Sequence, residues 1–368
     1  MKGIVLHGGH GTRLRPLTHT GPKQLIPIAN KPISQYVIED LKEAGIEDVA
    51  IVVGHIQPEE VKNKYGDGSE FGLNITYIEQ EKPKGIAQAV GLCEDFVGEE
   101  RFVVYLGDNL VKGEIGRLVE RFKDSTSDAL VFLCEVDDPT KFGVAKFNDG
   151  GDLVKLIEKP DDPPSNYALT GIYFFTPKIF DMIEKLEPSG RGELEITEAI
   201  QMLLEKGYDV DHDFVRGWWK DTGTPEDVLA ANRLILDDNF KPGLEGEIED
   251  ESQVQGRVAL GKNSKVEAGA KIRGPVAIGE NCNIKRGVYI GSYTSIGDGT
   301  GIRNGEIENS ILMKNCQIDV DERIVDSLIG PNSKINSKKK KDKTFRKELH
   351  LGQVFRCRTI IKAKRSKK

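Results

Sequence analysis

Apolar and polar positions alternate in two different ways along this chain. Over residues 1–238, amphipathic stretches alternate with short runs of β-branched, aromatic and aliphatic residues, at 3–6, 49–53, 102–106 and 130–133. Such runs are typical of buried strands in a mostly parallel sheet. Pro32 and Pro225 each precede apolar residues at helical spacing, and proline suits the first turn of a helix. The alternation predicts an α/β fold with a Rossmann-like, mostly parallel sheet and ligands at the carboxyl ends of its strands.

A six-residue period replaces this pattern after Phe240. Nine aliphatic residues fall six apart without a gap: Val254, Leu260, Val266, Ile272, Ile278, Ile284, Ile290, Ile296 and Ile302. The period slips near Glu308 and resumes at Leu312, Ile318 and Ile324. A hexapeptide period predicts a parallel β-helix with three hexapeptides in each coil. We therefore expect a first domain over 1–240, a linker over 241–252, a left-handed β-helix over 253–336 and a basic tail over 337–368.

Cysteine usage and hydropathy favour a cytoplasmic protein. The cysteines are odd in number, scattered and without a C-x-x-C pair: Cys93, Cys134, Cys282, Cys316 and Cys357. This spacing argues against a disulfide framework and against a structural zinc site. The apolar run at 3–6 is too short for a signal peptide, and no stretch reaches the ~20 apolar residues of a transmembrane helix.

Charge is distributed unevenly over the 368 residues. From Lys334 to Lys368 there are 15 Lys or Arg against two acidic residues, whereas the whole chain has a formal net charge of −7. The rest of the chain is therefore strongly acidic, which argues against nucleic acid as its main ligand. We expect the tail to be a solvated extension, and contacts of the tail with RNA or an anionic membrane are the alternative.

The turn after the first strand concentrates glycines and basic residues. Residues 8–11 hold three glycines, which leave room for a close ligand because they carry no Cβ atom. Arg13, Arg15 and Lys23 follow, and backbone N–H groups with clustered cations suit a polyphosphate. Leu14 replaces the third glycine of a Rossmann fingerprint, and the Gly-Lys-Ser/Thr ending of a Walker A loop is missing. An ordinary glycine-rich turn is the alternative.

Several stretches together resemble the signature motifs of sugar-1-phosphate nucleotidylyltransferases: Gly8–Thr18, Pro22–Leu25, Tyr105–Asn109, Glu158–Pro160, Arg191–Thr197 and Trp218–Gly223. Residues 1–335 are most similar to the long form of glucose-1-phosphate thymidylyltransferases. The resemblance implies a catalytic nucleotidyltransferase domain over 1–240 in a homo-oligomer. It also implies transfer of a nucleotidyl group from dTTP to glucose 1-phosphate, with release of pyrophosphate. The same reaction with UTP or with another sugar 1-phosphate is the alternative.

The chemistry implied by the resemblance requires no strong general base. A phosphomonoester has a second pKa near ~6, so the attacking oxygen is already largely dianionic at neutral pH. The protein has to align two anions and absorb developing charge. The resemblance assigns this catalytic work to Arg13, Lys23, Lys159 and Arg191.

The resemblance also implies three sets of binding residues. The nucleotide is expected at Leu6, Gly8, Gly9, Gly11, Thr12, Gln80, Pro83, Gly85 and Asp108. The sugar phosphate is expected at Gly143, Glu158, Lys159, Gly171 and Arg191. Mg²⁺, which takes one or two carboxylates together with phosphates and water, is expected at Asp108 and Asp221.

Some of these residues also have ordinary structural interpretations. Asp108 suits a turn after a strand, and Asp221 suits a cap for the helix near Pro225. Glu158 and Lys159 suit a surface ion pair. The glycines at 143 and 171 suit turns.

Two residues leave open which base the bound nucleotide carries. Gln80 can both donate to and accept from the imide edge that thymine and uracil share, so it does not separate dTTP from UTP. His7 stands where the family usually has a small residue, near the expected base, and it could either stack on the base or crowd it.

Two rival functions remain open to test. A hexapeptide acyltransferase would use a histidine as general base, but the repeat region contains none. We therefore interpret the predicted β-helix as an assembly or regulatory module. A non-catalytic regulatory subunit is expected to have lost a catalytic or metal-binding residue, but all are present: Arg13, Lys23, Asp108, Lys159 and Asp221.

Overall fold

The computed structural model divides the chain into two compact units. It describes residues 1–337 except 10, 20, 114 and 239, together with the short strands β29 (Glu348–His350), β30 (Val354–Phe355) and β31 (Arg358–Ile360). The first unit comprises Met1–His10 and Ile33–Asp221, and the second comprises Gly11–Pro32 and the chain from Thr222 onward. Most of the basic tail predicted over 337–368 lies outside the described residues.

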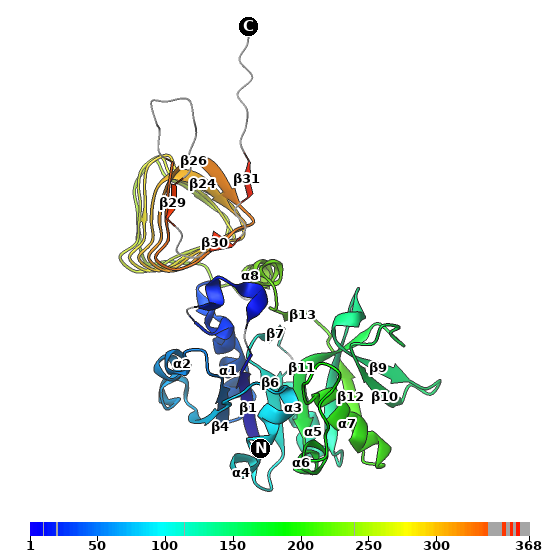
Figure 1. Cartoon of the computed structure of the whole chain (residues 1–368). Helices are drawn as coiled ribbons and strands as arrows, with labels where there is room; N and C mark the ends of the chain where they lie inside the picture. The colour runs from blue at the N-terminus through cyan, green and yellow to red at the C-terminus, as the bar shows by residue number, and fades with distance from the viewer. Residues whose placement is uncertain are drawn as a thin grey trace. The chain divides into compact units, whose positions relative to one another are not determined.

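The first unit is built on a mixed, largely parallel nine-stranded sheet (Figure 1). At its centre β1 (Lys2–His7) runs parallel to β4 (Asp48–Val53) and β6 (Phe102–Leu106). Further strands complete the sheet: β5 (Asn74–Glu79), β8 (Ala129–Glu135), β9 (Gly143–Phe147), β10 (Leu153–Glu158), β11 (Tyr167–Phe175) and β12 (Val210–Phe214). β5 and β12 pair in parallel with β4 and β8, whereas β11 is antiparallel to β6, β8 and β9. The four strands predicted from apolar runs are confirmed.

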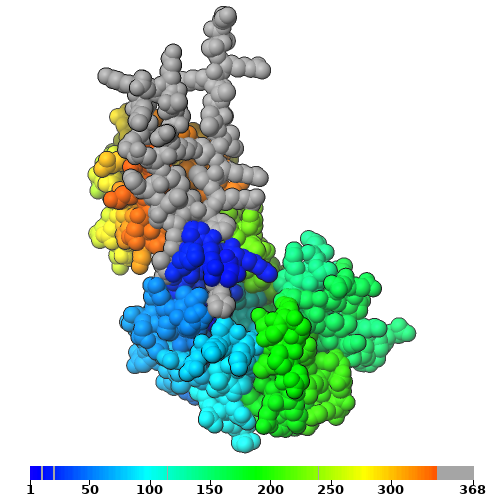
Figure 2. Space-filling view, viewed as in Figure 1, coloured from blue at the N-terminus to red at the C-terminus, as the bar shows by residue number. Residues whose placement is uncertain are grey.

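Helices cover this sheet by burying apolar stripes. α5 (Ile115–Asp124) buries Ile115, Leu118, Val119 and Phe122, which share one helical face. The other helices of the unit are α1 (Ile33–Glu43), α2 (Pro58–Tyr65), α3 (Ile86–Gly91), α4 (Glu94–Val97), α6 (Lys178–Ile183) and α7 (Ile196–Glu205). The space-filling view shows cyan and green segments of this unit packed against one another at its surface (Figure 2).

Parallel pairing brings two of the predicted loops to one edge of the sheet. The carboxyl ends of β1 and β6 are neighbours, and the Gly107 N–H donates to the Leu6 carbonyl oxygen over 3.0 Å. The start of the glycine-rich turn and the Asp108 loop therefore leave the sheet side by side.

In the second unit, short parallel strands form stacked three-sided coils, drawn in yellow and orange (Figure 1). Residues 18 apart pair between successive coils, as in Val258 with Val276 and Ile284 with Ile302. The repeat residues form one buried core that runs through the coils. These features are consistent with a β-helix. The strands are β14 (Gly243–Leu244), β15 (Glu247–Ile248), β16 (Gln253–Gln255), β17 (Val258–Leu260), β18 (Lys265–Val266), β19 (Lys271–Arg273), β20 (Val276–Ile278), β21 (Asn283–Ile284), β22 (Tyr289–Ile290), β23 (Thr294–Ile296), β24 (Gly301–Glu308), β25 (Ile311–Leu312), β26 (Gln317–Val325), β27 (Leu328–Ile329) and β28 (Lys334–Asn336).

The coil begins earlier in the chain than the hexapeptide pattern. β14 and β15 lie within the stretch expected as a linker, 241–252, and pair in parallel with β17 and β18. The aliphatic period reaches this first coil at Ile248, six residues before Val254, but the acidic residues around it are typical of a linker. The period slips near Glu308 because later coils are shorter: Ile302 pairs with Ile318, 16 residues on, and Ile311 pairs with Leu328, 17 residues on.

The second unit also contains α8 (Pro225–Asp238), the strands β2 (Pro27–Ile28) and β3 (Lys31–Pro32), and the short 3₁₀ helices η1 (Thr12–Leu14), η2 (Leu17–His19) and η3 (Lys23–Leu25). Pro225 is the first residue of α8, as predicted. Thr224 caps this helix, because its Oγ1 accepts a hydrogen bond from the Asp227 N–H over 3.2 Å.

Membrane-spanning helices and disulfide bonds can be assessed within the described residues. Within those residues, no helix combines the length and apolar character that a membrane crossing requires. The four cysteines described are free thiols: Cys93, Cys134, Cys282 and Cys316.

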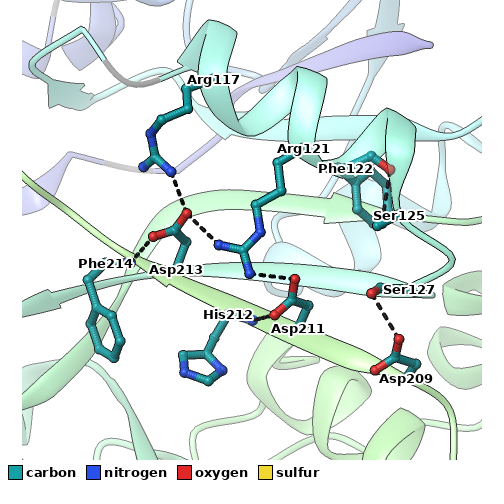
Figure 3. A network of polar contacts seen from close by, with 10 residues as sticks. All are labelled: Arg117, Arg121, Phe122, Ser125, Ser127, Asp209, Asp211, His212, Asp213 and Phe214. Carbon is teal, nitrogen blue, oxygen red and sulfur yellow. Dashed lines mark hydrogen bonds and ion pairs between the residues drawn. The ribbon is translucent and has the colours of Figure 1, made fainter.

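A polar network ties α5 to β12 (Figure 3). Arg117 and Arg121 both contact the Oδ2 atom of Asp213, at 2.5 and 2.6 Å, and Arg121 also contacts Asp211 at 2.7 Å. Burial acts to raise the pKa of Asp213, but the hydrogen bonds from Arg117, the Phe214 N–H and Arg121 outweigh it and lower that pKa below its usual value. The network therefore stabilises the folded chain only while Asp213 is ionised.

We predict a pH-dependent loss of stability for Asp213→Asn. At pH 7 the variant should lose about 1–3 kcal/mol of unfolding free energy, because two guanidinium groups lose a charged acceptor. Asp213 has its pKa lowered by folding, so its contribution is present above its unfolded pKa near ~3.9 and disappears as the pH falls through the folded value. Urea unfolding at pH 7 and pH 3 measures the difference.

The control for this prediction is Asp138→Asn, which removes a carboxylate from an exposed pair with Lys141 and should change stability little. An equal loss for Asp213→Asn at both pH values would contradict the assigned role of the ionised carboxylate.

Candidate functional site

A carboxylate–guanidinium network joins β10 to the loop before α7. Arg191 Nη2 donates to Glu158 Oε1 at 2.8 Å and to Glu195 Oε1 at 2.7 Å. Thr197 Oγ1 donates to the other Glu158 oxygen at 2.7 Å, and Ser189 Oγ donates to Glu195 at 2.8 Å. Burial acts to lower the pKa of Arg191, but the hydrogen bond and negative charge of Glu195, with the charge of Glu158, raise it. The network holds a half-exposed guanidinium in a fixed place, where it can meet an anion.

Glu158 and Lys159 are more than a surface ion pair. Lys159 Nζ lies 3.4 Å from Glu158 Oε1, but Glu158 is also held by Arg191 and Thr197. Lys159 has a φ of 42°, in the left-handed region, and its N–H donates to the Phe142 carbonyl over 2.9 Å. A non-glycine residue rarely adopts this conformation, so its occurrence here marks a constrained position.

Gly143 lies against this network. A Cβ atom at Gly143 would stand 2.7 Å from Thr197 Oγ1 and 3.3 Å from Glu158 Oε2. Gly143 is the first residue of β9 and pairs with Glu158 in β10. The structure therefore gives this glycine a packing role beside the network, within a strand rather than in a turn.

A second group of polar side chains surrounds Asp108. Trp219 Nε1 donates to Asn109 Oδ1 at 2.7 Å, and Asn109 Nδ2 donates to Asp108 Oδ1 at 3.1 Å. β7 (Asn109–Val111) and β13 (Trp219–Asp221) pair antiparallel, so Asp221 lies opposite Asn109. The two predicted metal carboxylates therefore occupy neighbouring positions. Asp221 lies in strand β13. The cap of α8, a role that the sequence also allowed for Asp221, is provided by Thr224.

Electrostatic contacts place Asp108 and Glu158 near one common residue. Burial first, and then the negative charges of Glu158 and Asp108, raise the pKa of Tyr173 well above its usual value. Gly171, two residues earlier in β11, packs against the Asp108 loop, because a Cβ atom there would lie 2.8 Å from Asn109 Cγ. The carboxylate–guanidinium network and the Asp108 group thus share one region of the first unit.

The loop at 80–88 presents one buried amide beside the glycine-rich turn. Gln80 is 3% exposed, and its Nε2 donates to Gln88 Oε1 at 2.6 Å. A Cβ atom at Gly8 would lie 2.4 Å from Gln80 Oε1. The absence of a side chain at Gly8 therefore makes room for the carboxamide of Gln80.

Gly85 brings this loop onto the segment that carries Arg191. Its φ is 112°, and a Cβ atom would lie 2.3 Å from the Leu194 carbonyl oxygen. Two backbone hydrogen bonds follow the contact, from the Leu194 N–H to Lys84 and from the Ala87 N–H to Leu194. Pro83 is half-buried two residues earlier in the same loop.

The remaining predicted residues lie at the end of β1 or in the second unit. Leu6 is buried in β1, and Gly9 follows with a φ of 102°. Gly11, Thr12, Arg13 and Lys23 belong to the second unit. There Thr18 Oγ1 donates to the Gly11 carbonyl at 2.7 Å, which closes the turn beneath η1 and leaves Arg13 exposed.

His7 is buried in β1, and its ring lies edge-on to the ring of Tyr65 with 6.1 Å between centroids. This contact gives His7 a packing partner inside the first unit.

Sequence reasoning missed five side chains of these groups: Asn109, Ser189, Glu195, Thr197 and Trp219. All lie in or beside stretches that carried the family resemblance. Their hydrogen bonds to Arg191, Glu158 and Asp108 depend on which neighbouring strands meet, which the motifs alone do not reveal. Gln88 was missed in the same way, since only its contact with Gln80 identifies it.

The chain is similar to known nucleotidyltransferases over most of its length. Residues 2–238 match the family described as nucleotidyl transferase, and residues 272–345 match the GMPPB C-terminal domain. The low-salt glycan biosynthesis nucleotidyltransferase Agl11 of Haloferax volcanii is 52% identical over 337 residues, which cover 92% of this chain and 94% of that protein. The alignment with Agl11 therefore includes both the sheet domain and the coil.

The chain also matches relatives that are named for two different nucleotides. A glucose-1-phosphate thymidylyltransferase of Streptomyces antibioticus is 48% identical over 72% of this chain and 74% of its own. A UTP–glucose-1-phosphate uridylyltransferase, AglF of Haloferax volcanii, is 40% identical over 65% of this chain and 98% of its own. A Bacillus anthracis crystal structure, provisionally described as a glucose-1-phosphate thymidylyltransferase with a sucrose, has a TM-score of 0.62 and 44% identity, covering 66% of this chain and 97% of that one.

We predict that Gly85→Ala destabilises the first unit by about 3 kcal/mol. The added Cβ would collide with backbone atoms of Leu194, which cannot swing aside as a flexible side chain can. Chemical unfolding of the variant and the parent protein measures the loss.

Gly98→Ala is the matched control, because Gly98 also has a positive φ, of 59°, but nothing lies within 4 Å of an added Cβ. It should lose only about 1 kcal/mol from backbone strain. Equal losses at the two positions would show that the contact with Leu194 is unimportant.

Proposed function

Since this chain belongs to the nucleotidyl transferase family, we propose that it transfers a nucleotidyl group from dTTP to glucose 1-phosphate and releases pyrophosphate. One observation carries the proposal: four of the motif residues, Asp108, Glu158, Arg191 and Asp221, lie in one region of the first unit. In β11, Gly171 packs against Asn109 and Ala168 pairs with Val144 of β9, the strand next to Glu158, while β7–β13 pairing sets Asp221 opposite Asn109. Such a cluster at the carboxyl ends of parallel strands can receive two phosphorylated ligands.

Glu158 and Arg191 are proposed to bind the sugar phosphate. The Arg191 guanidinium is held in place by Glu158 and Glu195, and it keeps further N–H donors for a phosphate. Glu158 can accept hydrogen bonds from sugar hydroxyls, while Lys159 adds a second cation at the same strand end. These groups would align the attacking oxygen and offset its charge without removing a proton from it.

Arg13 and Lys23 are proposed to bind the triphosphate. Arg13 is exposed on η1, two residues after the positive-φ residue Gly11, so a phosphate can approach both its guanidinium and the turn backbone. Neutralisation of the leaving pyrophosphate would be their main catalytic contribution.

The carboxylates of Asp108 and Asp221 are of the kind that Mg²⁺ prefers as ligands. They are two carboxylates at neighbouring positions, and Mg²⁺ commonly takes one or two carboxylates with phosphate and water oxygens. Among the described residues there is no group of three or more His, Cys, Asp or Glu side chains placed to hold an ion. A bound Mg²⁺ would therefore share its coordination with the nucleotide, and it would add positive charge at the phosphates.

The nucleotide is proposed to carry an imide base, and UTP remains the second candidate. The thymidylyltransferase and uridylyltransferase relatives both match this chain. Gln80 offers the same acceptor to thymine and to uracil, so the proposal of dTTP follows the resemblance rather than this contact.

The coil of the second unit is proposed to be a left-handed β-helix that serves in assembly of a homo-oligomer. The 18-residue register between coils and the continuous aliphatic core support a β-helix. Acetyl transfer is not expected, because the repeat region contains no histidine.

We predict that Asp221→Asn lowers kcat at least 100-fold, a loss typical when transition-state charge stabilisation is removed. Pyrophosphate release from dTTP, glucose 1-phosphate and Mg²⁺ measures the effect. Asp67→Asn removes an exposed carboxylate elsewhere in the same unit and should leave turnover unchanged. Full turnover by Asp221→Asn would contradict the proposed metal role.

We also predict that Gln88 sets base selectivity. The Lys84 N–H, which can only donate, approaches Gln88 Oε1 at 3.4 Å and so orients that amide. Gln88 in turn engages the Gln80 nitrogen, which leaves the Gln80 oxygen as an acceptor. Thymine and uracil offer a donor at N3, whereas cytosine offers an acceptor there.

Gln88→Met should therefore reduce the preference for UTP over CTP by about 10–100-fold, because the Gln80 amide becomes free to rotate. Gln88→Glu keeps an acceptor for Gln80 and should retain most of the preference. The ratio of kcat/KM values for the two nucleotides tests this, and an unchanged ratio in Gln88→Met would refute it.

A further inference from the structure

A fully buried amide joins three distant segments of the second unit. Asn232 lies in α8 and is 0% exposed. Its Oδ1 accepts hydrogen bonds from the Ala29 N–H at 2.9 Å and from Ser295 Oγ at 2.7 Å, and its Nδ2 donates to the Tyr293 carbonyl at 3.0 Å. One side chain thus connects α8, the segment before α1 and the face of the coil.

The segment that contains Ala29 also carries the two basic side chains that are proposed to bind the triphosphate. Residues 11–32, here called the basic arm, contain Arg13 and Lys23 and belong to the same unit as the coil. The arm therefore has its catalytic residues near its beginning and its anchor near its end. Fixing the end limits the positions that the beginning can take.

The arm also contacts the coil directly through Asn30. Its Nδ2 donates to the Ile296 carbonyl at 2.9 Å and to the Ala277 carbonyl at 3.4 Å. Ala29 and Asn30 have φ values of 47° and 65°, a left-handed pair that bends the arm at this point. Asparagine adopts this region more readily than most residues, so Asn30 suits both the bend and the contact.

The coil face is built to receive these contacts. Val276 and Ile278 point into the coil core, so Ala277 between them points outward, as does Ser295 in the next coil. Both outward residues are nevertheless buried, at 3% and 0% exposure. Their small side chains allow the amides of Asn30 and Asn232 to reach the coil.

We infer that Asn232 is a positioning residue, which holds the basic arm against α8 and the coil so that Arg13 and Lys23 meet the triphosphate. The inference rests on the proposed function of those two cations. Removing the amide would leave the partly buried Ala29 N–H and Tyr293 carbonyl without this partner. Since misplacement of about 1 Å can reduce catalysis about 100-fold, a loosened arm should impair the reaction of the nucleotide. The coil would then contribute to catalysis through the arm, in addition to any role in assembly.

The experiment uses the full-length protein with Asn232→Leu, which keeps the branched shape of the side chain, although leucine is larger, and removes all three hydrogen bonds. Steady-state pyrophosphate release and glucose 1-phosphate binding are measured together with hydrogen exchange of the Ala29 amide. We expect kcat/KM for the nucleotide to fall about 10–100-fold, glucose 1-phosphate affinity to stay within about twofold, and Ala29 exchange to accelerate at least about tenfold.

Asn30→Gly is the second variant, because glycine tolerates the positive φ and α8 remains untouched. It should show the same pattern if Asn232→Leu fails to fold. Arg233→Ala is the matched control: Arg233 also joins α8 to the coil, through Asn309 at 2.6 Å, and its contacts within the described part of the chain are with the coil and not with the arm. It should change neither nucleotide turnover nor Ala29 exchange.

Folded Asn232→Leu or Asn30→Gly variants with unchanged nucleotide kcat/KM would overturn the inference. So would equal losses in nucleotide turnover and glucose 1-phosphate affinity, which indicate general destabilisation. A parent protein that releases no pyrophosphate from any nucleotide would instead overturn the proposed function. In that case faster Ala29 exchange in the variants would support the anchor, and unchanged exchange would overturn it.

Discussion

The parallel pairing of β1 with β6 is the constraint on which the candidate site depends. It brings the carboxyl ends of two apolar strands together, so that the glycine-rich turn and the Asp108 loop start from one edge. Strand pairing fixes these positions through backbone hydrogen bonds and does not depend on the loop sequences. The loops are thereby free to carry glycines and charged residues that would be unfavourable inside the sheet.

Charge compensation then shapes the site around this edge. Arg191 is held between Glu158 and Glu195, and Asn109 links Trp219 to Asp108. A guanidinium already paired with carboxylates loses little rotational freedom when it meets a phosphate. The arrangement suits a reaction that depends on alignment and electrostatics, with no requirement for a histidine base.

The sequence predicted the elements well because each one carries its own local signal. Apolar runs marked β1, β4, β6 and β8, Pro225 marked the start of α8, and the aliphatic period marked the coil. The first coil was missed because acidic residues surround Ile248, its residue on the aliphatic period, and the slip near Glu308 followed from shorter coils.

The site was only partly predictable, for a physical reason. Resemblance named Glu158, Arg191, Asp108 and Asp221, but the partners that orient them come from other strands and loops. Thr197 reaches Glu158 across 39 positions, and Trp219 reaches Asn109 across 110. The assignment of residues 11–32 to the same unit as the coil, anchored by Asn232, also has no local signal, since it depends on contacts up to 266 positions apart.

The most direct test is a pyrophosphate-release panel with the full-length protein, Mg²⁺ and glucose 1-phosphate, crossed with dTTP, UTP, CTP, GTP and ATP. The account predicts rapid release with dTTP or UTP, and at least about tenfold lower kcat/KM with CTP. Absence of release with every nucleotide, or a clear preference for CTP or ATP, would contradict it.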